Sequence, residues 1–175
     1  MKHAWLIAVL AASMALLGCR NPVVSEEQAA LGPEQPGVPH GPLHRPGQPC
    51  TLCHSASGGN HPEFSLAGTV YKSADSNEPL VGAVVQVIDK DGAQRDLTTN
   101  AAGTFYVTSS DWSPNFPLWT SVGYSCGDTA ATYVHADMQT QIFRATACAD
   151  CHFDPSGPSS AGHIYLSSTA AGLCP

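Results

Sequence analysis

Two short stretches of the chain carry the residue types best suited to chemistry, and both have the same spacing. Cys-Thr-Leu-Cys-His occupies positions 50–54, and Cys-Ala-Asp-Cys-His occupies positions 148–152. In a helical turn, side chains three and four positions apart lie on one side, so each motif presents two thiols and an imidazole together. Such a set can bond a haem covalently and ligate its iron, form half of a zinc site, or close a disulfide.

The start of the chain indicates the compartment in which these thiols lie. Residues 1–18 combine the positive Lys2 with an apolar run that is too short to span a bilayer, as in a signal peptide. The ending Leu16-Leu17-Gly18-Cys19 resembles a bacterial lipobox, in which cleavage leaves Cys19 as the lipidated first residue. An ordinary signal peptide before an incidental cysteine is the alternative. Because Arg20, and not Asp, follows Cys19, we expect a lipid anchor in the outer membrane of a bacterial cell envelope.

Both pentapeptides resemble the attachment sites of c-type cytochromes. The resemblance implies two covalently attached haem c groups. Cys50 and Cys53 would hold the first, with His54 as its proximal iron ligand, and Cys148, Cys151 and His152 would hold the second. The expected compartment agrees, because haem is attached covalently outside the cytoplasm.

Two other uses of the same cysteines stay open. In an oxidising compartment each Cys-x-x-Cys pair can form a disulfide, which leaves the adjoining histidines without a role. The two pairs can also build one four-thiolate zinc site, with the intervening domain inserted between them. A thioredoxin-like redox pair is excluded, because the sequence contains no β-α-β pattern around either motif.

A low-spin haem iron takes a second axial ligand from the protein. The chain after the signal peptide has one methionine, Met138, so two His/Met haems are excluded. A further histidine follows each motif, and we expect His61 and His163 to be the sixth ligands. His40, His44 and His135 are the reserve candidates. Two His/His haems would have lower potentials than His/Met haems, which suits a respiratory or metal-reducing route.

Cys126 and Cys174 remain after the motifs and Cys19 are assigned. A protein outside the cytoplasm seldom keeps two free thiols, so we expect these two to form a disulfide that fastens the C-terminal tail to the domain. A loose Cys174 near the chain end is the alternative.

Short segments rich in β-branched and aromatic residues fill the middle of the chain, with polar turns between them. The clearest turns are 90–92 (Lys-Asp-Gly) and 100–103 (Asn-Ala-Ala-Gly). The pattern predicts an all-β fold, a seven-stranded antiparallel β-sandwich flanked by short irregular haem-binding segments. The expected strands are 64–72, 80–89, 93–99, 104–109, 118–124, 131–136 and 141–147, of which the last could also be a helical turn.

Part of this region also resembles a known family. Residues 68–71 (Gly-Thr-Val-Tyr), 82–89 (Gly-Ala-Val-Val-Gln-Val-Ile-Asp), Gly92 and 99–106 (Thr-Asn-Ala-Ala-Gly-Thr-Phe-Tyr) are similar to the carboxypeptidase regulatory-like, or transthyretin-like, domain. The resemblance covers roughly residues 64–125. It implies a transthyretin-like or Ig-like sandwich without catalytic residues, a module that is usually adhesive or scaffolding.

These patterns divide the chain into five parts. A signal peptide at 1–18 precedes a tether at 19–49, whose many prolines and glycines predict an extended chain. The first Cys-x-x-Cys-His segment covers 50–61 and the sandwich 62–147, and the second motif and tail cover 148–175. A leader without a spacing role is the alternative for 19–49. We expect both motifs to meet at one end of the sandwich.

Composition and missing motifs narrow the function. The formal net charge is −7 and no basic cluster exists, so we expect no nucleic-acid partner. No nucleophile elbow, His-Glu-x-x-His motif or phosphate loop is present, so we expect no enzyme activity. The sequence favours a lipid-anchored dihaem cytochrome that exchanges electrons with a redox partner protein or an extracytoplasmic acceptor. The alternative is an adhesive or scaffolding lipoprotein whose cysteine pairs are disulfides or a zinc site.

Overall fold

Strands dominate the chain in the computed structural model, which describes residues 21–34, 37–38, 41–127, 133–154, 156–167 and 173–174. The expected signal peptide, Cys19 and His40 lie outside these residues. Within them, no helix is both long and apolar enough to cross a membrane. The elements are α2 (Pro22–Ala30), α3 (Cys50–Cys53), β1 (Phe64–Ser73), β2 (Val84–Ile88), β3 (Gln94–Thr98), β4 (Thr104–Thr108), β5 (Trp119–Ser125), β6 (Tyr133–Asp137), the 3₁₀ turn η2 (Cys148–Asp150) and β7 (Ile164–Ser167).

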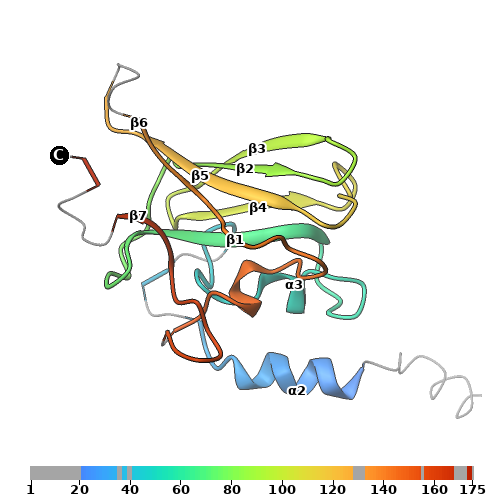
Figure 1. The fold of residues 1–175 in the computed structure, drawn as a ribbon. Helices are drawn as coiled ribbons and strands as arrows, with labels where there is room; N and C mark the ends of the chain where they lie inside the picture. The colour runs from blue at the N-terminus through green and yellow to red at the C-terminus, as the bar shows by residue number, and fades with distance from the viewer. Residues whose placement is uncertain are drawn as a thin grey trace, which may run out of the picture.

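The strands of the described residues form two sheets (Figure 1). One has the order β4-β1-β7, and the other has the order β3-β2-β5-β6. Neighbouring strands are antiparallel in both sheets except for β1 and β7, which are parallel and pair Val70 with Ile164. The expectation of a wholly antiparallel arrangement is therefore wrong for this pair.

The core lies between the two sheets. β2 explains how it forms, because its residues alternate and only Val85 and Val87 are buried. The opposing sheet contributes Leu66 and Val70 from β1 and Phe105 from β4 to the same cluster. Burial of these large apolar side chains is the main force that holds the sheets together.

Both predicted turns are present and are held by side chains. Asp89 Oδ1 accepts hydrogen bonds from the backbone N–H groups of Asp91 and Ala93, and Gly92 between them has a φ of +82°. Asn100 Oδ1 accepts from the N–H groups of Ala102 and Thr104 in the same way. These Asx-type contacts set the connections on either side of β3.

The seventh strand is not where the sequence predicted it. Segment 141–147 touches each sheet once, through the bridges Leu118–Ile142 and Ala67–Ala147, and forms no strand. Because the segment crosses from one sheet to the other, it does not pair continuously with a strand of either sheet. The seventh strand is β7, which comes from the C-terminal segment after the second Cys-x-x-Cys-His motif.

The segment expected to be an extended tether contains a helix. α2 begins after Asn21, whose side chain accepts from the Val23 N–H, and Pro22 occupies the first turn, where its missing N–H costs nothing. Gln28 then donates from Nε2 to the carbonyl oxygens of Leu52 and Gly58. This part of the N-terminal region is therefore packed against the first motif.

Candidate functional site

The first motif forms a single helical turn, α3. The His54 N–H donates to the Cys50 carbonyl at 2.9 Å, which brings the start and end of the pentapeptide together. Cys50 and Cys53 are partly buried and are not joined by a disulfide. Gly58 fits closely beneath this turn, since a Cβ at that position would lie 2.4 Å from the carbonyl oxygens of Leu52 and Cys53.

The second motif repeats the first in a 3₁₀ turn. The His152 N–H donates to the Cys148 carbonyl, again at 2.9 Å, and the Cys151 N–H does so at 3.1 Å. Cys148 packs on the sandwich core directly over Gly68, where an added Cβ would lie 2.8 Å from Cys148 Sγ. The glycine at position 68 is thus needed for the close approach of the motif to β1.

The two motif histidines have the same hydrogen-bond pattern. Nδ1 of His54 lies 2.9 Å from the carbonyl oxygen of Pro62, and Nδ1 of His152 lies 2.9 Å from that of Gly162. Because a carbonyl oxygen can only accept, each Nδ1 carries the ring proton. Each neutral ring therefore keeps an unprotonated Nε2, the nitrogen that metal-ligating histidines offer when their other nitrogen is bound to a carbonyl.

The two motifs are neighbours beside the first half of β1 (Figure 1). Thr146 Oγ1 donates to Thr51 Oγ1 at 3.1 Å, and the Ala67 N–H of β1 donates to the Thr146 carbonyl at 2.9 Å. The sequence led us to expect both motifs at one end of the sandwich. In the structure they are neighbours, but they lie along β1.

Burial controls the acidity of the motif thiols. Burial raises the pKa of Cys148 to about 12, with smaller contributions from Cys50, Asp150 and Cys151. Burial likewise raises the pKa of Cys50 to about 11. Both thiols are therefore protonated at neutral pH.

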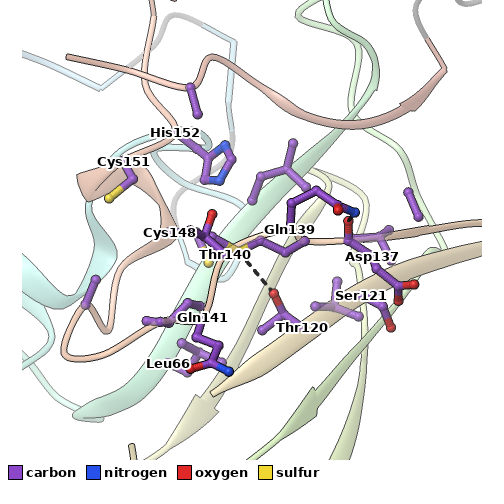
Figure 2. A pocket seen from close by; sticks show the side chains of 18 of the residues that line it. Leu66, Thr120, Ser121, Asp137, Gln139, Thr140, Gln141, Cys148, Cys151 and His152 are labelled. Carbon is purple, nitrogen blue, oxygen red and sulfur yellow. Dashed lines mark hydrogen bonds between the residues drawn. The ribbon is translucent and has the colours of Figure 1, made fainter. Parts of the chain in front are cut away.

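An apolar cavity of about 660 Å³ adjoins the second motif. Figure 2 shows Cys148, Cys151 and His152 on one side of it and Thr120 and Ser121 of β5 on the other. Its apolar lining includes Leu66, Val85, Phe105, Val122, Ile142 and Ile164. A largely apolar cavity of this size that also contains polar groups is typical of a small-molecule or cofactor site.

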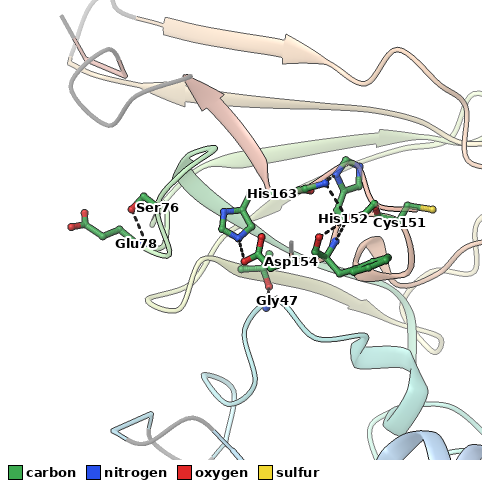
Figure 3. A network of polar contacts seen from close by, with 11 residues as sticks. Gly47, Ser76, Glu78, Cys151, His152, Asp154 and His163 are labelled. Atoms are coloured by element: carbon green, nitrogen blue, oxygen red, sulfur yellow. Dashed lines mark hydrogen bonds and ion pairs between the residues drawn. The ribbon is translucent and has the colours of Figure 1, made fainter. Parts of the chain in front are cut away.

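His163 also lines this cavity, and its ring is held by contacts with two other side chains. It is buried, its ring stacks on Tyr71 with centroids 3.9 Å apart, and its Nε2 lies 2.5 Å from Asp154 Oδ2 (Figure 3). The carboxylate must accept, so Nε2 carries a proton. Nδ1 of the same ring is buried without a hydrogen-bond partner among the described residues.

The other predicted ligands lie in different surroundings. His61 is exposed, in the loop that returns the chain to β1. His135 is also exposed, with Nε2 3.6 Å from Asp137 Oδ1. The His44 ring lies beside that of His54, with centroids 5.9 Å apart. Met138 entered the sequence analysis only as the single methionine after the signal peptide. In the structure it lines the cavity, and its sulfur accepts a hydrogen bond from Thr120 Oγ1.

Cys126 and Cys174 form a disulfide in the structure, the pairing expected from the sequence. The four motif cysteines are free thiols. Among the residues that the structure describes, no group of three or more His, Cys, Asp or Glu side chains is arranged to hold a metal ion. Comparison of the chain with protein-family models, with curated proteins and with solved structures gives no match.

Proposed function

We propose that the protein is a lipid-anchored dihaem c-type cytochrome that transfers electrons outside the cytoplasm. The observation that carries the proposal is the shared geometry of the two motifs. In each, a helical turn brings two free thiols to a histidine whose Nδ1 is bound to a backbone carbonyl and whose Nε2 remains unprotonated. The two motifs begin 98 positions apart in the sequence. If their histidines were incidental, we would not expect both motifs to show this pattern.

The residues assigned to the haems have consistent surroundings. Cys50, Cys53 and His54 would hold one haem, and Cys148, Cys151 and His152 the other. The apolar cavity beside the second motif supports a group bound there, as does Nδ1 of His163, which has no hydrogen-bond partner among the described residues. A bound haem supplies an iron that takes up or releases one electron, which a redox partner provides or removes. His54 and His152 would ligate the irons, and the Pro62 and Gly162 carbonyls would orient their rings.

Other parts of the proposal come from the sequence alone. The lipid anchor at Cys19 would hold the protein in the outer membrane. The β-rich domain would be a variant of the carboxypeptidase regulatory-like sandwich that presents both haems on β1. It would act as a scaffold and not as a catalyst.

The rival function is an adhesive or scaffolding lipoprotein with two disulfide staples. Individually exposed aromatic side chains are the feature that favours it: Trp119 at the start of β5, Tyr133 opposite the end of β5, and Phe143. The separate disulfide between Cys126 and Cys174 counts against it, because the motif cysteines stay unpaired in the same structure.

One measurement separates the two functions. The full chain is produced in a bacterium that attaches haem outside the cytoplasm, and covalently bound haem is counted by mass spectrometry and by the absorption of the denatured protein. We expect two haems per chain, one in a Cys50→Ser/Cys53→Ser variant and one in a Cys148→Ser/Cys151→Ser variant. A chain without haem whose motif cysteines are paired with each other would overturn the proposal in favour of the rival.

A further inference from the structure

His44 and His54 form a closely spaced pair although ten positions separate them. Their ring centroids lie 5.9 Å apart with an interplanar angle of 45°. A metal–nitrogen bond is about 2 Å long, and the centre of an imidazole ring lies about 1 Å behind its nitrogen. Two imidazoles on opposite sides of one iron therefore have centroids about 6 Å apart. The centroid spacing of His44 and His54 is close to that value.

Both rings are committed to the backbone through the same nitrogen. Nδ1 of His44 donates to the carbonyl of Gly41, and Nδ1 of His54 donates to that of Pro62. Each ring thus has its proton on Nδ1 and a lone pair on Nε2. When both rings are neutral, the pair offers two Nε2 atoms to a metal, because both N–H donors are already bound to backbone carbonyls.

The segment that carries His44 is held in place on both sides. Asn100 Nδ2 donates to the Pro42 carbonyl at 3.0 Å, and the Gly47 N–H donates to Thr69 Oγ1 at 2.8 Å. Arg45, directly after His44, has a φ of +52°, a backbone conformation that costs a non-glycine residue free energy. Its guanidinium donates to the Gly32 carbonyl and to Gln48 Oε1, which fixes that conformation.

The His54 ring is fixed as well. It stacks on Phe64 with centroids 4.3 Å apart, and Phe64 in turn stacks on Tyr106 of the neighbouring strand at 4.5 Å. The sandwich therefore orients one ring of the pair, and the N-terminal segment orients the other.

We propose that His44 is the sixth ligand of the haem held by Cys50, Cys53 and His54, in place of His61. The inference rests on the proposed function, since it names a ligand of that site. His61 keeps an indirect part, because it belongs to the loop whose Pro62 carbonyl holds His54. The segment before the first motif then acts as part of the haem site and not only as a spacer.

The test compares His44→Ala with His61→Ala in the full, haem-loaded chain. We expect His44→Ala to keep two covalent haems and to convert one of them from low-spin to high-spin in optical and EPR spectra. Added imidazole should restore the low-spin form. His61→Ala should keep the wild-type spectra. A His44→Met variant should remain low-spin, and the midpoint potential of one haem should rise, because methionine ligation raises the potential.

The outcomes of this test are distinct from those of the haem count. A wild-type chain without haem would overturn the proposed function itself. A haem-loaded His44→Ala protein with both irons still low-spin would overturn the ligand assignment alone, as would a high-spin His61→Ala protein. If His44→Ala lost haem by misfolding, the His44→Met potential would decide, and an unchanged potential in that variant would also overturn the assignment.

Discussion

Each motif histidine has one ring nitrogen committed to the protein backbone. The carbonyls of Pro62 and Gly162 fix which nitrogen carries the proton and also fix the plane of each ring. In metal-ligating histidines, the hydrogen bond of the other ring nitrogen fixes both the tautomer and the orientation of the ring. Loop residues eight and ten positions beyond the histidines provide these carbonyls, so each pentapeptide depends on the loop that follows it.

The proposed second haem would have two candidate donors for its sixth position, His163 and Met138. The buried Nδ1 of His163 has no hydrogen-bond partner among the described residues, whereas the sulfur of Met138 already accepts a hydrogen bond from Thr120. We therefore expect His163→Ala to convert one haem to high-spin at unchanged haem content, and Met138→Leu to leave both spectra and potentials as in the wild type. EPR spectra and redox titrations of the two variants check this. The reverse result would make Met138 the ligand.

At the residue scale, the proposed attachment residues follow from the sequence alone, whereas the proposal of His44 as a distal ligand needed the structure. Cys-x-x-Cys-His is a local pattern, and a helical turn determines its geometry wherever it occurs. The approach of His44 to His54 depends on contacts of the intervening chain with Thr69 and Asn100, which spacing along the sequence does not encode. Spacing along the sequence favours His61, the nearest downstream histidine, which is exposed in the structure.

Among the elements, the connection between β2 and β3 depends on one carboxylate. Burial acts to raise the pKa of Asp89, but hydrogen bonds from the backbone N–H groups of Asn115, Ala93 and Asp91 outweigh it, so the pKa is lowered. Asp89→Ala removes three acceptor contacts at once, so we expect the thermal midpoint at pH 7 to fall by several degrees. Asp89→Asn, which keeps an acceptor oxygen, should lose less. Circular dichroism melts of the three proteins measure both effects.

The same carboxylate predicts a dependence on pH. Its pKa is lower in the folded chain than in the unfolded one, so the folded state holds the ionised form more tightly. This contribution to the free energy of unfolding is complete above the unfolded pKa of about 4 and is lost as the pH falls through the folded value. The stability difference between wild type and Asp89→Asn should therefore shrink at low pH. An equal difference at pH 7 and pH 3 would contradict this origin.

Elements with a strong period were predictable, and those defined by tertiary contacts were not. β1 to β6 follow the alternation and the polar turns of the sequence, with ends that differ by a few residues. β7 has only four residues and pairs with β1 in parallel, an arrangement that no turn signals. α2 was hidden because the prolines and glycines of 32–49 dominate the composition of the whole segment. Asn21-Pro22 was the local signal for its start.

For the whole molecule, β1 is the element that unites the proposed site. It pairs with β4 and β7, receives the first motif at its beginning and bonds to Thr146 just before the second. Motifs that lie far apart in the sequence therefore become neighbours through one strand. This arrangement would suit electron transfer between two haems in one chain better than two separate sites on opposite ends.

The Cys126–Cys174 disulfide fastens the segment after β7 to the end of β5, so it links the two sheets on the side of the C-terminal tail. Its partners are 48 positions apart, and Leu173 beside it is buried in the core. We expect Cys126→Ser/Cys174→Ser to lower the free energy of unfolding by about 2–4 kcal/mol, because the unfolded chain regains the freedom that the cross-link removed. Denaturant titrations of the haem-loaded proteins measure the loss. Reduction of the wild type should reproduce it, and the variant should still carry two haems, since neither cysteine belongs to a motif. A variant as stable as the wild type would show that β7 and Leu173 hold the tail without the cross-link.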